Sequence, residues 1–164
     1  MADFDYSAMG TMEASDVTSS KLGMAYVIVN GNRYKLFQAK QIDTKYDKEK
    51  KKVNILGRVS AGNKAVGGSG TGKMTIYKNT DLFTKMILKY MNDGEDTYFD
   101  LMIVNYDPTS KAGKRVLIAK KCNIDGGDMA SLNVDNDWLE EEVNFTYERM
   151  ELPTPFTELE GMTE

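Results

Sequence analysis

Apolar and polar residues alternate along most of this chain with the period of two that is typical of β-strands. Asn30-Gly31 lies between the first two alternating runs and predicts a tight hairpin, because both residues tolerate positive φ angles. The alternation predicts about eight strands, at residues 24–30, 33–41, 53–59, 73–78, 98–105, 115–124, 129–134 and 138–150.

One segment has the helical period instead. Its apolar residues recur near every 3.6 positions, at Leu82, Phe83, Met86, Ile87, Tyr90 and Met91. Asn79 or Thr80 can cap its start, and Gly94 is placed to end it. The sequence therefore predicts one α-helix between the strands.

These elements predict the fold class and the domain organisation. Many alternating strands and a single helix indicate a mainly β protein, an antiparallel β-sandwich or barrel with one α-helix packed against it. We expect a flexible N-terminal arm at residues 1–22, a single β-rich domain at 23–152 and an acidic C-terminal tail at 153–164, because both ends are polar and Pro153 and Pro155 interrupt the last strand.

Charge is distributed in opposed blocks along the chain. Residues 33–64 hold ten basic and three acidic residues, whereas residues 125–164 hold twelve acidic residues and one basic residue. Such blocks suit copies of a chain that meet through complementary faces, or else two solvated surfaces of one monomer. The predicted assembly-interface residues come from the basic block and the glycine-rich stretch after it: Lys45, Lys48, Lys50, Lys51, Lys52, Arg58, Lys64, Gly68 and Gly70.

Composition argues against catalysis. The chain has no histidine and one cysteine, Cys122, so Ser-His-Asp triads, Cys-His pairs and histidine metal ligands are excluded. We expect no enzyme activity, no catalytic or metal-binding residues and no cofactor. The longest nearly uncharged stretch, residues 22–32, is much shorter than the ~20 residues of a membrane span, so we expect no membrane binding.

A glycine-rich stretch matches a phosphate-binding motif. Residues 67–73 read G-x-x-x-x-G-K, the core of a loop whose backbone N–H groups surround phosphates. Met74 stands where a Ser or Thr would bind magnesium, and Lys73 leads into a predicted strand instead of a helix. We therefore interpret the stretch as a mobile Gly/Ser loop, with nucleotide binding as the less favoured reading.

A series of short motifs resembles a known family. Residues 53–58, 70–78, 98–100, 105–108, 122–125 and 139–146 read VNILGR, GTGKMTIYK, YFD, NYDP, CNID and LEEEVNFT. Their order and spacing resemble those of the contractile-tail tube proteins of the PBSX-type phage group, over about residues 25–156. The tubes of R-type bacteriocins and type VI secretion systems are similar in fold.

This resemblance implies a structural role. It implies hexameric rings that stack into the inner tail tube of a contractile tail, with DNA only in transit. The implied partners are the chain itself and the sheath, baseplate, tape-measure and tail-terminator proteins, and the implied location is the virion tail, assembled in the host bacterial cytoplasm. A channel for DNA should be acidic or neutral, so Asp100, Glu140 and Glu142 are candidate lumen residues. Glu140 and Glu142 share one strand face, and Glu141 points to the other.

Three alternatives compete with this hypothesis. The same subunit would also suit the tube of an R-type bacteriocin or a secretion-like contractile particle. A nucleotide hydrolase built on Lys73 is a different class of protein. A monomeric β-sandwich adaptor or capsid decoration protein is the third.

Overall fold

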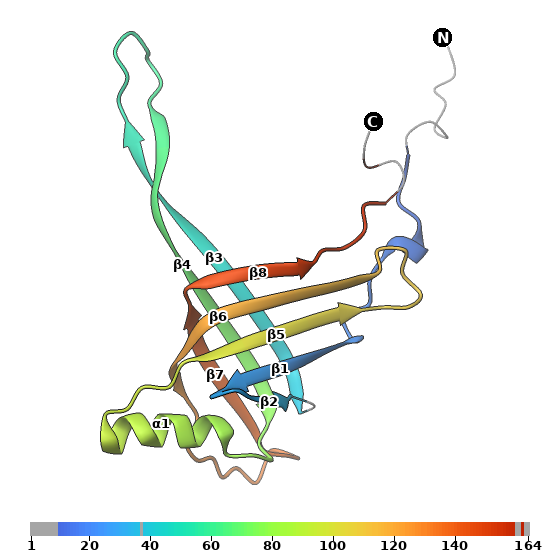
Figure 1. The fold of residues 1–164 in the computed structure, drawn as a ribbon, viewed down its shortest axis with the longest axis vertical. Coiled ribbons are helices and arrows are strands. Elements are labelled where there is room, and N and C mark those ends of the chain that lie inside the picture. The colour runs from blue at the N-terminus through green and yellow to red at the C-terminus, as the bar shows by residue number, and fades with distance from the viewer. Residues whose placement is uncertain (1–9, 37, 160–161, 163–164) are drawn as a thin grey trace.

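The computed structural model describes residues 10–36, 38–159 and 162 and has a mainly β architecture (Figure 1). Eight strands form an antiparallel sheet, and the described residues include one α-helix, which confirms the predicted fold class. The end strands of the sheet do not pair with each other, so the sheet is not closed into a barrel. The elements are a short 3₁₀ helix η2 (Ala14–Asp16), β1 (Gly23–Val29), β2 (Asn32–Lys35), β3 (Ala39–Val53), β4 (Gly62–Tyr77), α1 (Leu82–Asp93), β5 (Phe99–Tyr106), β6 (Lys114–Gly127), β7 (Glu140–Tyr147) and β8 (Arg149–Thr154).

The sheet folds over into two layers at β6. The first layer has the order β2-β1-β5-β6-β8, and the second has the order β6-β7-β4-β3. In Figure 1, β7, β4 and β3 run steeply across the strands of the first layer. Strand β6 belongs to both layers because its first part pairs with β5 and β8, and Asn123–Gly127 pair with β7.

A β-bulge allows β6 to change layers. Phe99 pairs with Cys122, but Leu101 pairs with Ala119, so β6 contains one extra residue at this point. Lys121 within the bulge has φ +55°, which is unusual for a residue with a Cβ atom. Bulges bend a strand and increase its twist, and here the bend directs the rest of β6 into the second layer.

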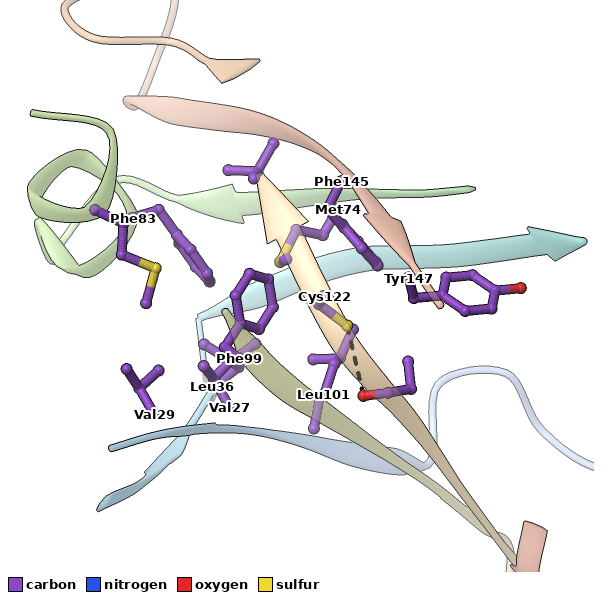
Figure 2. Packing of buried hydrophobic residues seen from close by; sticks show 14 of the residues in the cluster. Val27, Val29, Leu36, Met74, Phe83, Phe99, Leu101, Cys122, Phe145 and Tyr147 are labelled. Atoms are coloured by element: carbon purple, nitrogen blue, oxygen red, sulfur yellow. Dashed lines mark hydrogen bonds between the residues drawn. The ribbon is translucent and has the colours of Figure 1, made fainter. Parts of the chain in front are cut away.

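The core lies between the two layers, as Figure 2 shows. Leu101 and Cys122 from the first layer face Met74 and Phe145 from the second, and all four are fully buried. Phe99 connects the layers, because its ring lies 6.2 Å from the ring of Phe145. This is the apolar face that the alternating sequence predicts.

Helix α1 closes one end of this core. Phe83 and Met86 are its buried residues, and the Phe83 ring packs edge-on against Phe99 at 6.1 Å. The helix ends at Gly94, as predicted, where φ is +71° and the backbone N–H bonds to the carbonyl of Tyr90. Asp81, rather than Asn79 or Thr80, occupies the N-cap position.

Five predicted strands differ from the structure. The strand predicted at residues 73–78 is only the end of β4, which begins at Gly62. Residues 33–41 contain the end of β2, a break, and the start of β3, whereas residues 53–59 form the end and the turn of a long hairpin. No strand is present at residues 129–134. The run at 138–150 is two strands, because the chain leaves the second layer after Tyr147 and enters the first as β8.

Part of the predicted arm contacts the β5–β6 turn. The predicted arm and tail include residues 1–9, 160–161 and 163–164, which lie outside the described residues. Within residues 13–22, the arm segment, Ser19 N donates to Asp107 Oδ2 at 2.9 Å, and Lys111 Nζ lies 3.1 Å from Glu13 Oε2. Among the described residues, no helix is long and apolar enough to cross a membrane.

Candidate assembly surfaces

A two-stranded ribbon projects from the sheet. Strands β3 and β4 pair as far as Val53 and Gly62, but β7 pairs with β4 only as far as Gly70. Residues 47–69, called the ribbon from here on, therefore have no third strand beside them, and Figure 1 shows the hairpin rising away from both layers. At ~3.3 Å per residue, the seven residues from 47 to 53 span about 23 Å. Isolated two-stranded hairpins are marginally stable in water, so such a ribbon calls for a partner surface.

Aromatic rings packed over glycines fix the base of the ribbon. A Cβ atom on Gly70 or Gly72 would lie 2.5 Å from the Tyr147 ring or 2.2 Å from the Phe145 ring, respectively. One on Gly68 would meet Tyr46 in the same way. These glycines recur every second residue and so lie on one face of β4, where their missing side chains make room for the rings. Among the predicted interface residues, Gly68 and Gly70 thus have a role within the chain.

The interpretation of residues 67–73 as a mobile loop is wrong, because they form part of β4. Lys73 points away from the core and lies 3.3 Å from Glu142, and the chain continues as a strand through Tyr77. The helix N-terminus that a phosphate-binding loop requires is therefore missing at this position. The structure gives no support to a nucleotide site built on Lys73.

The ribbon concentrates positive charge, because it holds five lysines and one arginine against two acidic residues, Asp47 and Glu49. Lys51 and Lys64 lie directly opposite each other on the two strands, a like-charge pair that is unfavourable in an isolated hairpin. Lys45, at the base, lies 3.4 Å from Asp47. Within the described part of the chain, no carboxylate lies within 4.0 Å of the other predicted cations of the interface, which are Lys48, Lys50, Lys51, Lys52, Arg58 and Lys64. The ribbon is thus suited to an acidic partner.

The tip of the ribbon is apolar and exposed. Leu56 and Val59 are fully exposed, at 102% and 107%, and Ile55 is 42% exposed. The turn is closed by a hydrogen bond from Arg58 N to Ile55 O at 3.2 Å, and Gly57 supplies the φ of +84° that the turn requires. Large apolar side chains held this far from the core are typical of a binding surface.

Among the described strands, β2, β8 and β3 each have a free edge, and so does the part of β4 within the ribbon. Strand β2 has only four residues, and Pro153 lies within β8, where it removes a backbone donor. Strand β3 has fifteen residues and no proline. It is therefore the edge best suited to pair with a strand of another subunit.

The three candidate lumen residues lie on two different faces. Asp100 is on the outer face of the first layer, and its Oδ2 lies 3.3 Å from Lys120 Nζ. Glu140 and Glu142 are on the outer face of the second layer. Since the two faces belong to different layers, a channel lined by a single face can include only one of the two groups.

A lysine of the same chain also partly neutralises the Glu140 carboxylate. Lys40 Nζ and Trp138 Nε1 both donate to Glu140 Oε1, each at 2.9 Å. The Lys40 hydrogen bond, followed by that of Trp138, lowers the pKa of Glu140, and the same hydrogen bond raises the pKa of Lys40. The ion pairs Lys40–Glu140 and Lys73–Glu142 bring the charge of the outer face of β7 closer to neutral than its glutamates suggest.

Sequence reasoning missed the importance of Glu141. Its side chain is 1% exposed, and Lys78 Nζ lies 3.1 Å from its Oε2. Burial raises the pKa of the Glu141 carboxyl, against the smaller opposing effect of Lys78. The signal was present in the sequence, because Glu141 has the same strand parity as Val143 and Phe145, which line the core.

Comparison with known proteins identifies the family of this chain. A family model described as "Phage tail tube protein" matches residues 10–154. The chain is 34% identical over 142 residues to the phage-like element PBSX protein XkdM of Bacillus subtilis (strain 168), which covers 87% of this chain and 94% of that protein.

Solved structures share the fold. A chain of the anti-feeding prophage baseplate aligns with a TM-score of 0.63 and 12% identity, over 88% of this chain and 97% of that one. A chain of the PVC sheath-tube complex, from an extracellular contractile injection system in the extended state, aligns with a TM-score of 0.61 and 10% identity, over 87% and 98%. The family model and the PBSX relative confirm the resemblance that the sequence motifs indicate. The chain therefore belongs to the phage tail tube protein family and is a structural protein rather than an enzyme.

Proposed function

We propose that this chain is the structural subunit of the inner tail tube of a contractile phage tail. In this proposal the subunits form hexameric rings, the rings stack, and DNA passes through the central channel. The observation that carries the proposal is the ribbon at residues 47–69, which reaches beyond the body of the subunit and has an exposed apolar tip. In a monomeric adaptor or decoration protein the apolar tip would need a different protein to cover it, whereas stacked copies of this chain supply that surface themselves.

Contacts within a ring would use the free edge of β3. Its backbone groups can pair with a strand of the next subunit and extend the sheet from one copy to another. An interface of this kind is heterologous, and it closes into a ring when the rotation between neighbours divides a full turn. The proposed ring closes after six copies.

Contacts between rings would use the ribbon and its cations. The acidic block at residues 125–164 supplies the complementary charge. Charge pairing across rings would fix the register of stacking and would also relieve the opposition of Lys51 and Lys64.

The proposed partners follow from the position of a tube in a tail. They are the sheath outside the tube, the baseplate and tail-terminator proteins at its ends, and a tape-measure protein inside it. The similar PVC chain comes from a sheath-tube complex, and the similar anti-feeding prophage chain comes from a baseplate. The proposed location is the virion tail, after assembly in the host bacterial cytoplasm.

A contractile particle without a capsid, such as an R-type bacteriocin or an injection system, is the second candidate. The fold shared with the PVC and anti-feeding prophage chains favours it as much as it favours a phage. Purification of particles from the producing cells distinguishes the two. Tails joined to DNA-filled capsids support the phage, and tails without capsids support the other particle.

Size-exclusion chromatography with light scattering, followed by negative-stain microscopy, tests self-assembly of the purified chain. We expect rings or tubes as protein concentration rises and as salt concentration falls, because charge pairing contributes to stacking. A protein that stays monomeric at every salt and protein concentration would contradict the proposal.

A further inference from the structure

A cavity lies under the loop that connects β6 to β7. Its volume is about 330 Å³, at the lower end of the ~300–1,000 Å³ range of ligand pockets, which suits one or two side chains better than a large ligand. We call this cavity the acidic socket, and its main lining residues are Asp128, Met129, Leu132, Leu139, Glu140 and Glu141. Leu132 is fully exposed, and Met129 and Leu139 are about four-tenths exposed, so apolar surface surrounds the carboxylates.

Of the three carboxylates that line the socket, Asp128 is the one without a cation within 4.0 Å among the described residues, whereas Glu140 is paired with Lys40 and Glu141 with Lys78. Glu141 is 1% exposed, and neither of its carboxylate oxygens has a hydrogen-bond partner among the described residues. Lys78 lies 3.1 Å from Oε2 without hydrogen-bond geometry. The same ammonium donates to the Thr84 hydroxyl and lies 3.9 Å from Asp81. Glu141 is thus closed off from outside and has Lys78 beside it. The carboxylate that is open to an incoming guanidinium is that of the exposed Asp128, which can accept two parallel hydrogen bonds.

The tip of the ribbon has the complementary chemistry. Arg58 is exposed and has no carboxylate within 4.0 Å among the described residues. Leu56 and Val59 lie on either side of it in the sequence, and both are fully exposed. One guanidinium beside two apolar side chains matches a mainly apolar cavity with the exposed carboxylate of Asp128 beside it.

The tip and the socket cannot meet within one molecule. In Figure 1 the ribbon tip lies at one end of the longest axis, and the β6–β7 loop lies at the other, beside α1. A contact between sites at opposite ends of the molecule joins one copy to the next and repeats without closing, as stacking requires. We propose that the acidic socket receives the ribbon tip of a second copy of this chain from the adjacent ring, with Leu56 and Val59 against its apolar lining and Arg58 directed at the exposed carboxylate of Asp128. This inference rests on the proposed function, because it specifies the stacking contact of the tube.

Cysteine cross-linking tests the contact. Cys122 is fully buried, and burial raises the pKa of its thiol to about 12, so the natural cysteine stays protonated and unreactive. In a Leu56→Cys/Leu132→Cys variant, both new thiols are exposed, so the fold is preserved. Under mild oxidation we expect a ladder of cross-linked oligomers on a non-reducing gel. The control variant Leu56→Cys/Leu152→Cys, whose second cysteine is on β8, should stop at dimers.

A charge variant tests the role of Arg58. Arg58→Glu in the Leu56→Cys/Leu132→Cys background should lower the yield of the ladder at least tenfold, whereas Lys114→Glu, the same charge change at an exposed lysine at the start of β6, should lower it less than twofold. Equal ladders in the cross-linking variant and its Leu152 control, or equal effects of the two charge variants, would overturn the socket. Wild-type tubes in electron micrographs would then leave the proposed function intact. Failure of the wild-type chain to form rings or tubes would overturn the proposed function itself.

Discussion

Replacement of Gly72 by alanine tests how the base of the ribbon is packed. The added Cβ atom would lie 2.2, 2.5 and 2.8 Å from three carbons of the Phe145 ring, whereas ordinary contact begins at 3.4 Å. Phe145 is fully buried, and its ring is held by Phe99 at 6.2 Å, so it cannot move aside without disturbing the core. The substitution should therefore destabilise the fold.

Two opposing contributions set the magnitude. Overpacking of a well-packed core costs about 1–3 kcal/mol, and this clash with a rigid ring belongs in the upper part of that range. Alanine also restricts the unfolded chain, which stabilises a compatible site by about 0.4–1 kcal/mol. Gly72 has no positive φ, so backbone strain adds nothing. We expect a net loss of about 1–2 kcal/mol in the free energy of unfolding and a fall of about 2–8 °C in Tm.

Denaturant and thermal unfolding, followed by circular dichroism at a concentration where the chain is monomeric, measure this loss. The matched control is Gly67→Ala, in the same strand, where the nearest atom to the added Cβ is Glu49 Oε2 at 4.0 Å. This control should be as stable as wild type or slightly more stable. Phe145→Leu should partly rescue Gly72→Ala in a double-mutant cycle. Equal stability of Gly72→Ala and Gly67→Ala would refute the packing of Phe145 over Gly72.

Three further predictions concern charged groups. The folded state raises the pKa of Glu141, so the free energy of unfolding should fall as pH rises from about 4.5 through the folded pKa. Glu141→Gln should abolish this fall in denaturant titrations. An unchanged pH profile in the variant would count against burial of the carboxyl. Hydrogen bonds from the Thr109 hydroxyl and then from the backbone N–H of Ser19 lower the pKa of Asp107, so the stabilisation by its carboxylate is lost as pH falls through the folded pKa. Asp107→Ala should release the arm segment, which limited proteolysis would show as faster cleavage. An unchanged cleavage rate would show that this contact does not hold the arm. Replacement of Lys50, Lys51 and Lys52 by glutamate should shorten the tubes and change the salt dependence of their assembly, while the circular dichroism spectrum stays the same. Tubes of wild-type length and salt sensitivity would show that these lysines take no part in the stacking contact.

Much of the sheet could be predicted from the sequence because its strands have one buried face. The runs at 24–30, 98–105 and 115–124 alternate clearly or are rich in β-branched residues, and each corresponds to a strand of the first layer. The helix was equally clear from its period and from Gly94. These features are local, so the sequence of each run is enough to predict its secondary structure.

The ribbon could not be predicted in the same way. Lysine and glycine are uncommon in strands, so the sequence predicted no strand at residues 45–52, and residues 67–73 were interpreted as a loop. Both faces of the ribbon are exposed in the single subunit, so its sequence carries no alternation between buried and exposed positions. The glycines at every second position were the signal, but their meaning depends on Tyr147 and Phe145, which approach from another strand.

The acidic socket depends on tertiary structure in a different way. The β6–β7 loop carries apolar residues, and the sequence predicted a strand at 129–134 for that reason. Only the position of the loop, next to the buried Glu141, shows that these residues frame a cavity. The strand parity of Glu141 indicates burial, but it does not identify Lys78 as its partner.

Cryo-electron microscopy of particles assembled from the purified chain tests the tube directly. We expect sixfold rings stacked around a continuous central channel, with the ribbon of each subunit reaching into the adjacent ring. Density that shows only monomers, closed dimers, or rings that never stack at high protein concentration and low salt would contradict the tail tube assignment of this subunit.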